Sequence, residues 1–168
     1  GMMLHGGVVA AMGTFFVFSD YMKPAVRIAA LMQVPVKFIW THDAFRVGED
    51  GPTHEPVEQE AQIRLMEKLK NHAGKDSVRV FRPADADETT VCWKLAMENV
   101  ETPTALIFSR QGIAKLPEGT DYEQAAKGAY IVAGSDENPD VILVASGSEV
   151  STLEAGCEAL RADGIKVR

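Results

Sequence analysis

The sequence predicts an α/β protein with a parallel sheet, followed by the first βαβ unit of a second α/β domain. Short apolar runs typical of buried strands alternate with segments whose apolar residues recur at helical spacing. Two of these runs lead directly into polar residues, as in parallel sheets that bind ligands at the carboxyl ends of their strands. Near the end of the chain, a strand, a helix and the start of another strand follow one another.

Local patterns place the individual elements. Pro24 is compatible with the first helix if it lies in the first turn, where its missing N–H is not needed. Asp85 and Glu88 have the spacing of a capping box, which predicts that a helix begins there. The expected order begins with a helix from about Tyr21 to Met32, a strand at 34–40, a helix at 57–71, a strand at 78–81, the capped helix to about Asn99 and a strand at 104–108. A connector at 111–138 follows and ends in a short strand near 130–132. The last expected elements are a strand at 141–145, a helix at 150–160 and a strand from 165.

Composition and charge narrow the class of protein. The 168 residues are 46% hydrophobic and 24% charged, which suits a soluble globular chain with one core or one domain and part of a second. The net charge of -7 without a basic stripe argues against nucleic acid or an anionic membrane as partners. No apolar run reaches the length of a membrane span and no signal-peptide pattern is visible, so a cytoplasmic location is expected. Cys92 and Cys157 have apolar neighbours and no metal-type spacing, which predicts buried thiols in a reducing compartment.

The loop at residues 41–56, after the strand at 34–40, is the strongest candidate site. It holds His42, Asp50 and His54 among glycines and prolines, which give a loop a defined shape. These three side chains suit the binding of a small polar ligand, as hydrogen-bond donors and an acceptor. Two histidines and a carboxylate are also a metal-ligand set, but their spacing matches no helical metal motif.

Two further features are candidates. Phe15, Phe18 and Tyr21 recur at three-residue steps, and this spacing alone favours a place in the core over a wall that stacks on a heteroaromatic ring. Arg110 directly follows a predicted strand, where a guanidinium can pair with a phosphate or a carboxylate. Most arginines in loops are solvated charges, so Arg110 by itself is a weak signal.

In order along the chain, these segments resemble the pyrimidine-binding domain of transketolases, which are thiamine-diphosphate enzymes of the pentose phosphate pathway. The match covers nearly the whole chain. Deoxyxylulose-phosphate synthases are similar over residues 50–54 but lack partners for residues 41–43 and 109–111. The matching motifs are Leu4-His5-Gly6-Gly7, Gly13-Thr14-Phe15 with Phe18 and Tyr21, Ala25-Val26-Arg27, Thr41-His42-Asp43, residues 48–59, Arg82-Pro83-Ala84-Asp85, Pro103-Thr104-Ala105-Leu106, Ser109-Arg110-Gln111 and Gly147-Ser148-Glu149-Val150.

The resemblance implies a reaction and its partners. A two-carbon ketol group moves from a ketose phosphate to an aldose phosphate, with thiamine diphosphate as the electron sink and Mg²⁺ as its companion in the full-length enzyme, which is a homodimer. It also reverses the interpretation of the aromatic row. The resemblance implies that Phe15, Phe18 and Tyr21 form a pocket for the aminopyrimidine ring, with Phe18 as the stacking partner. It implies that His42 and Arg110 bind the phosphate and that Asp50 accepts a hydrogen bond from a sugar hydroxyl. The catalytic His54 would contact both the cofactor and the donor substrate.

The same resemblance predicts the domain organisation. Residues 1–118 are expected to form the pyrimidine-binding domain, and residues 119–168 a connector and the start of the C-terminal domain. The family's catalytic glutamate would lie in an Arg-Glu-His segment before Gly1, and the diphosphate-binding domain that holds Mg²⁺ further upstream. The isolated chain is therefore expected to be inactive and to bind thiamine diphosphate weakly or not at all. Phe45-Arg46 replaces a pair that is more often small in the family, and residues 65–77 form a longer segment than usual.

Three alternatives stay open at this point. The chain is compatible with a separate subunit of a split thiamine-diphosphate enzyme. It is also compatible with a metal-dependent hydrolase that uses His42, Asp50 and His54. The third alternative is a non-catalytic interaction module.

Overall fold

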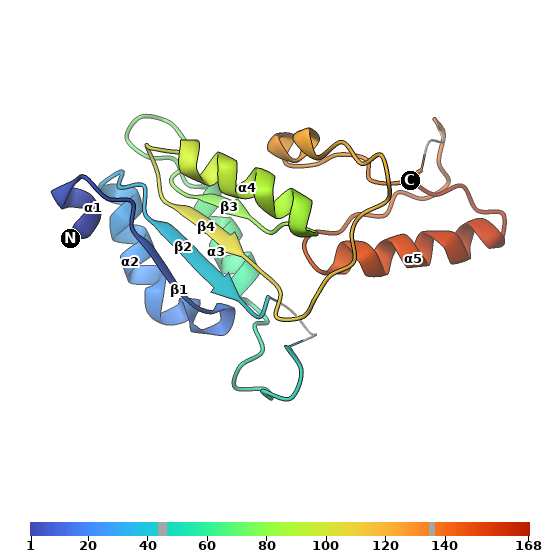
Figure 1. The fold of residues 1–168 in the computed structure, drawn as a ribbon, viewed down its shortest axis with the longest axis horizontal. Helices are drawn as coiled ribbons and strands as arrows, with labels where there is room; N and C mark the ends of the chain where they lie inside the picture. The colour runs from blue at the N-terminus through green and yellow to red at the C-terminus, as the bar shows by residue number, and fades with distance from the viewer. Residues whose placement is uncertain (44–46, 135–136) are drawn as a thin grey trace. The chain divides into compact units, whose positions relative to one another are not determined.

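Four strands form one sheet, which is parallel as the sequence predicts, although its first strand was not among the predicted ones (Figure 1). Their order is β1-β2-β4-β3, so β2 is paired on both sides. Phe15 lies opposite Thr41 where β1 and β2 end, and Trp40 lies opposite Ile107 where β4 ends. Since every pair is parallel, all carboxyl ends meet at one edge of the sheet. The strands are β1 (Ala11–Phe15), β2 (Lys37–Thr41), β3 (Arg79–Phe81) and β4 (Thr104–Ile107).

The computed structural model describes residues 1–43, 47–134 and 137–168. The chain divides into a first unit, residues 1–82 and 93–111, and a second unit, residues 83–92 and 112–168. The sheet belongs to the first unit. The pair Phe45-Arg46 lies outside the described residues. In the described part of the chain, no helix is long and apolar enough to span a membrane.

Three helices of the first unit, α2, α3 and α4, begin and end close to the predicted positions, whereas the short helix α1 was not predicted. The 3₁₀ turn η1 (Phe16–Phe18) leads directly into α2, so α2 begins earlier than expected. Pro24 therefore lies in the second turn, and the prediction that it occupies the first turn was wrong. Because proline has no N–H, the Asp20 carbonyl lacks its helical hydrogen bond. The helices are α1 (Met2–His5), α2 (Ser19–Leu31), α3 (Gln59–Lys68) and α4 (Ala86–Glu98), of which α4 extends into the second unit.

The hydrophobic core of the first unit is built around aromatic side chains of β2. Trp40 is fully buried, and its ring centroid lies 5.7 Å from that of Phe16 and 5.9 Å from that of Phe38. The indole Nε1 donates a hydrogen bond to the Met22 sulfur over 3.2 Å, so its polar group is satisfied. The cluster also contains Val26, Ala29, Ala30, Ile63, Val78, Val80, Ala105 and Ile107.

The second unit contains the 3₁₀ helix η3 (Tyr122–Lys127) and the helix α5 (Glu149–Ala162). Cys157 is buried on α5, as its stripe predicts, and the Cys92 thiol of α4 is buried too. Burial, with the nearby Glu88 carboxylate, raises the pKa of Cys92 to about 12, so this thiol is inert.

The strands expected at 130–132 and 141–145 do not form. Residues 130–132 have no strand structure, and the second segment keeps one parallel bridge, between Val141 and Val167. Val144 is 85% exposed and Ile142 64% exposed, so the apolar run lacks the neighbours that would bury it. The bridge is nevertheless parallel with α5 between its partners, which is the connection that the βαβ prediction requires.

The capping box predicted at the start of α4 is confirmed for Asp85, while Glu88 bonds the N–H of the residue before the cap. The Asp85 carboxylate accepts from the Glu88 N–H over 2.8 Å, and the Glu88 carboxylate accepts from the Ala84 N–H. Asp85 also accepts from the Leu116 N–H at 3.0 Å and from the Tyr122 hydroxyl at 2.6 Å. Burial by itself raises the pKa of Asp85, but the hydrogen bonds outweigh it and hold the pKa below its usual value. Asp85 thus ties the connector to the start of α4.

Asp85→Asn is expected to destabilise the chain by about 1–3 kcal/mol at neutral pH, because an amide NH₂ would replace an acceptor that receives buried donors. A carboxylate with a lowered pKa in the folded state adds stability above its unfolded pKa, and this stability is lost as the pH falls through the folded pKa. The wild type should therefore lose stability more steeply than Asp85→Asn below about pH 4. Urea unfolding between acid and neutral pH measures both effects. Asp87→Asn, at the exposed partner of Lys115, is the control, and equal stability of Asp85→Asn and wild type at neutral pH would contradict the expectation.

Candidate active site

The carboxyl edge of the sheet brings the predicted polar residues together. β2 ends at Thr41 and delivers His42, while the segment after β4 delivers Arg110. The long loop after β2 leaves the sheet at this edge (Figure 1) and carries Asp50 and His54. The site is therefore assembled within the first unit, at the position where parallel α/β sheets bind their ligands.

Asp50 lies between His42 and Arg110. Its Oδ2 atom is 3.6 Å from the His42 Nε2 atom and 3.5 Å from the Arg110 Nε atom. The same oxygen is buried without a hydrogen-bond partner among the described residues. Both ion-pair distances exceed those of strong hydrogen bonds, so imidazole and guanidinium keep donors for a ligand. The arrangement suits an anionic group with a neighbouring hydroxyl.

His42 is held in an unusual backbone conformation. Its φ is +64°, in the left-handed region that costs energy for a residue with a side chain. Two contacts fix the ring: the Phe15 ring stacks on it at 3.8 Å between centroids, and the Thr41 Oγ1 atom lies 2.9 Å from Nδ1. The imidazole is thus oriented with Nε2 toward Asp50.

Gly48 allows the loop to pass close to Arg110. Its φ is +88°, and a Cβ atom at this position would lie 3.0 Å from the Arg110 Nη1 atom. A side chain would therefore be strained by the backbone and would push against the guanidinium. The glycine is needed for the loop to reach the position that places Asp50 beside Arg110.

The aromatic row forms a surface cluster centred on Phe18. The Phe18 ring lies 6.1 Å from Phe15, 6.2 Å from Tyr21 and, edge to face, 5.2 Å from His54. Tyr21 is 82% exposed, and the residue of this segment that enters the core is Phe16. The core placement favoured by spacing alone was therefore wrong. Half-buried aromatic faces beside an imidazole fit a flat heteroaromatic ring such as an aminopyrimidine.

Phe15 connects the two halves of the site. Its ring contacts His42 on the polar side and lies 5.9 Å from the His54 ring on the aromatic side. The backbone N–H of His54 donates a hydrogen bond to the Gly51 carbonyl over 3.0 Å, and the Thr53 hydroxyl lies 2.9 Å from the His54 Nδ1 atom. These two contacts fix His54. All seven residues singled out in the sequence therefore lie in one continuous region: Phe15, Phe18, Tyr21, His42, Asp50, His54 and Arg110.

An ion-pair network beside the site was missed in the sequence. Arg82, directly after β3, binds the Asp43 carboxylate and also the Glu60 carboxylate of α3. Arg82 and Asp43 each follow the end of a strand. Their expected place at the same edge of the sheet could have indicated that they lie close together. Sequence alone does not pair them, because β4 separates β2 from β3 in the sheet.

The metal interpretation gains no support from this geometry. Among residues 1–43, 47–134 and 137–168, no three His, Cys, Asp or Glu side chains are placed to hold one metal ion. Within the site, Asp50 approaches His42, while His54 packs on the aromatic rings.

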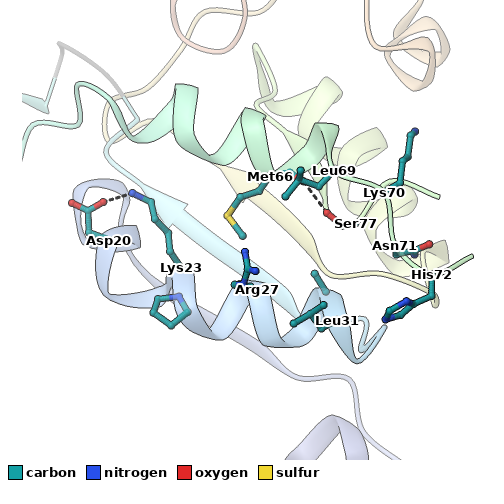
Figure 2. A pocket seen from close by; sticks show the side chains of 12 residues that line it. Asp20, Lys23, Arg27, Leu31, Met66, Leu69, Lys70, Asn71, His72 and Ser77 are labelled. Atoms are coloured by element: carbon teal, nitrogen blue, oxygen red, sulfur yellow. Dashed lines mark hydrogen bonds and ion pairs between the residues drawn. The ribbon is translucent and has the colours of Figure 1, made fainter. Parts of the chain in front are cut away.

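A cavity of about 660 Å³ between α2 and α3 is separate from this site (Figure 2). Two of its cations are already paired with acids, Lys23 with Asp20 and Lys70 with Asp76. None of its lining residues belongs to the candidate site. They are Asp20, Lys23, Pro24, Arg27, Ala30, Leu31, Met66, Leu69, Lys70, Asn71, His72 and Ser77.

Comparison with known proteins identifies the family. Residues 1–115 match the family model of the transketolase pyrimidine-binding domain, and residues 128–168 match that of the transketolase-like C-terminal domain. A transketolase from Halalkalibacterium halodurans is 50% identical over 167 residues, which cover 98% of this chain and 24% of the relative. The chain thus spans about a quarter of the length of such relatives. These relatives do not support the hydrolase alternative.

Solved structures agree. A transketolase from Pichia stipitis in complex with sedoheptulose-7-phosphate is 40% identical, with a TM-score of 0.81 over 94% of this chain and 22% of that one. A split-gene transketolase, described as an inactive β4 tetramer, is 26% identical, with a TM-score of 0.69 over 96% of this chain and 48% of that one. The sequence motifs, the parallel sheet and these matches lead to one conclusion: this chain belongs to the transketolase family.

Proposed function

We propose that this chain supplies the pyrimidine-facing and sugar-phosphate-facing parts of a transketolase, which transfers a two-carbon ketol group from a ketose phosphate to an aldose phosphate. The observation that carries the proposal is the convergence of His42, Asp50 and Arg110 beside the Phe15, Phe18 and His54 rings. The convergence lies at the carboxyl edge of a parallel sheet, in a chain of this family.

The aromatic cluster is proposed to bind thiamine diphosphate. This cofactor, when bound, supplies the electron sink for cleavage of a carbon–carbon bond. Phe18 presents a ring for stacking, with Phe15 and Tyr21 beside it, and His54 offers a polar edge. Mg²⁺ is expected to accompany the diphosphate, which a diphosphate-binding domain in the same or another polypeptide would hold.

The polar half of the site is proposed to bind the sugar phosphate. Arg110 and His42 donate to phosphate oxygens, for which a guanidinium is well suited. The Oδ2 atom of Asp50, which has no hydrogen-bond partner among the described residues, accepts a hydrogen bond from a sugar hydroxyl beside the phosphate. His54, whose ring packs against Phe15 and Phe18, is proposed as the catalytic residue of this chain, which moves a proton at the reacting carbon.

The assembly and the biological setting are part of the same proposal. Residues 1–118 act as the pyrimidine-binding domain, and residues 119–168 begin the C-terminal domain. The holoenzyme is a homodimer that works in the cytoplasm, in the pentose phosphate pathway. A second arrangement, in which this chain is a separate subunit, has a precedent in the split-gene transketolase to which the chain is similar.

A chimera tests the proposal. Residues 1–168 replace the matching segment of the Halalkalibacterium halodurans transketolase, and ketol transfer is measured with thiamine diphosphate and Mg²⁺. We expect kcat/KM within about tenfold of the parent enzyme, since the site residues and their supports come together in one segment. The same chimera with His54→Ala should lose about 10²–10⁴-fold, as expected for a proton-transfer group.

The chimera, calorimetry and a mixing experiment together separate the alternatives. A folded chimera that binds the cofactor but transfers no ketol group would refute the proposed function. Calorimetry of residues 1–168 alone, with thiamine diphosphate and Mg²⁺, is expected to show no tight binding. Activity restored by mixing this polypeptide with a separately produced diphosphate-binding domain would favour the split arrangement over a single continuous chain.

A further inference from the structure

Arg82 contacts both ends of the loop that carries Asp50 and His54. The guanidinium Nε and Nη2 atoms lie 3.0 Å and 2.8 Å from the Asp43 Oδ2 atom, at the start of the loop. The Nη1 atom donates to the Glu60 Oε2 atom over 3.2 Å, in the first turn of the helix that follows the loop. The Arg82 side chain therefore links Asp43, where the loop begins, to Glu60 in the helix that follows the loop.

This pair differs from an ordinary surface ion pair. The Arg82 and Asp43 side chains are only 6% and 3% exposed, so solvent and salt screen their interaction little. Removing Arg82 would take away the cation that contacts the buried Asp43 carboxylate, and breaking a buried ion pair is costly. Glu60, at 32% exposure, also lies 3.6 Å from Arg64, so it has a second cation.

Asp43 directly follows His42, whose backbone is in the left-handed region. Phe15 and Thr41 hold the imidazole from one side, and the Asp43–Arg82 pair fixes the chain from the other. If Asp43 were released, His42 could relax to a common backbone conformation and its Nε2 atom would turn away from Asp50. The loop would also lose the closure that places Asp50 beside Arg110.

We propose that Arg82 is a positioning residue that clamps this loop and so sets the preference for phosphorylated over unphosphorylated donor sugars. Arg82 acts through His42 and Asp50 and does not itself bind the sugar. This inference rests on the proposed function, because it assigns the phosphate to the side chains that the clamp orients.

Kinetics of the holoenzyme that contains these residues test the clamp. Arg82→Lys keeps a cation but cannot bridge two carboxylates, and Asp43→Asn keeps the shape but removes the charge. In both variants, the ratio of kcat/KM for a ketose phosphate to kcat/KM for the same ketose without phosphate should fall by about tenfold or more, as expected when binding groups move by a fraction of an ångström. Arg79→Lys, on the exposed side of the same strand, is the matched control and should leave the ratio unchanged.

A readout independent of activity separates this inference from the proposed function. Amide hydrogen exchange at residues 47–58 should become faster in Arg82→Lys and Asp43→Asn, with no change in α2. Unchanged loop exchange, or an unchanged preference for the phosphorylated donor in a folded variant, would overturn the clamp. If the wild-type holoenzyme transfers no ketol group while the variants still loosen the loop, the proposed function fails and the clamp's structural role is supported.

Discussion

Arg110→Leu is expected to raise the KM for a ketose phosphate about 100-fold in the holoenzyme. The Arg110 guanidinium is half-exposed, and its Nε atom lies 3.5 Å from the Asp50 Oδ2 atom. Because this ion pair is long, the guanidinium still has N–H donors for a phosphate. Loss of hydrogen bonds to a charged group costs about 1.5–3 kcal/mol, which corresponds to about 10–150-fold in affinity. The change also removes the guanidinium beside the Asp50 carboxylate, which then repels the phosphate more strongly, and this repulsion adds to the loss.

The matching measurement uses a donor without phosphate. For the same ketose lacking its phosphate, KM should change by less than about threefold, since the lost contacts are made to the phosphate. Arg79→Leu, at an exposed arginine of β3, controls for the loss of one positive charge. An equal loss on both donors would show that Arg110 orders the loop through Asp50 and Gly48 and does not bind the phosphate.

The parallel sheet was predictable because the buried strands of such sheets are continuous runs of apolar residues in the sequence. β2 and β4 are buried almost throughout, and their runs of β-branched, aromatic and other apolar residues stand out from the polar segments around them. Polar residues directly after both runs then predicted a site at their shared edge. Periodicity and caps, as at Asp85 and Glu88, placed the helices within a few residues.

β1 was not predicted, because its position weakens the pattern. Ala11, Met12 and Gly13 are exposed in this structure, so β1 lacks the apolar run of a central strand. Its last residue, Phe15, was instead grouped with Phe18 and Tyr21 at a spacing that mixes a strand end, a 3₁₀ turn and a helix. A single period cannot describe such a segment, and the core placement drawn from it failed.

Contacts that depend on strand order were beyond the sequence. The stacking of Phe15 on His42 follows from the register that sets Phe15 opposite Thr41. The pairing of Arg82 with Asp43 depends on the order β1-β2-β4-β3. Neither register nor order is encoded in local periodicity, since both are decided by packing of the whole sheet. Periodicity alone placed Phe15, Phe18 and Tyr21 in the core. The cofactor-binding role expected for them came from the resemblance to a known family.

Trp40→Ala is expected to lower the free energy of unfolding by about 3–5 kcal/mol, the usual cost of removing a large aromatic side chain from a core. Trp40 is fully buried in β2, contacts Phe16 and Phe38, and donates its N–H to Met22. A domain of this size is stabilised by about 5–15 kcal/mol in total, so the variant should unfold at much lower urea concentration or fail to fold. Equilibrium unfolding followed by circular dichroism measures the change.

The second tryptophan provides the control. Trp93 is half-buried and stacks on Phe108 at 6.4 Å between centroids, so Trp93→Ala should cost clearly less, about 1–2 kcal/mol. Trp40→Phe keeps most of the buried volume and should fold, with a smaller loss. Because His42 follows Trp40 by only two residues, directly after the end of the same strand, Trp40→Phe also tests whether core packing sets the site. Equal losses at Trp40 and Trp93 would show that β2 is not the centre of this core.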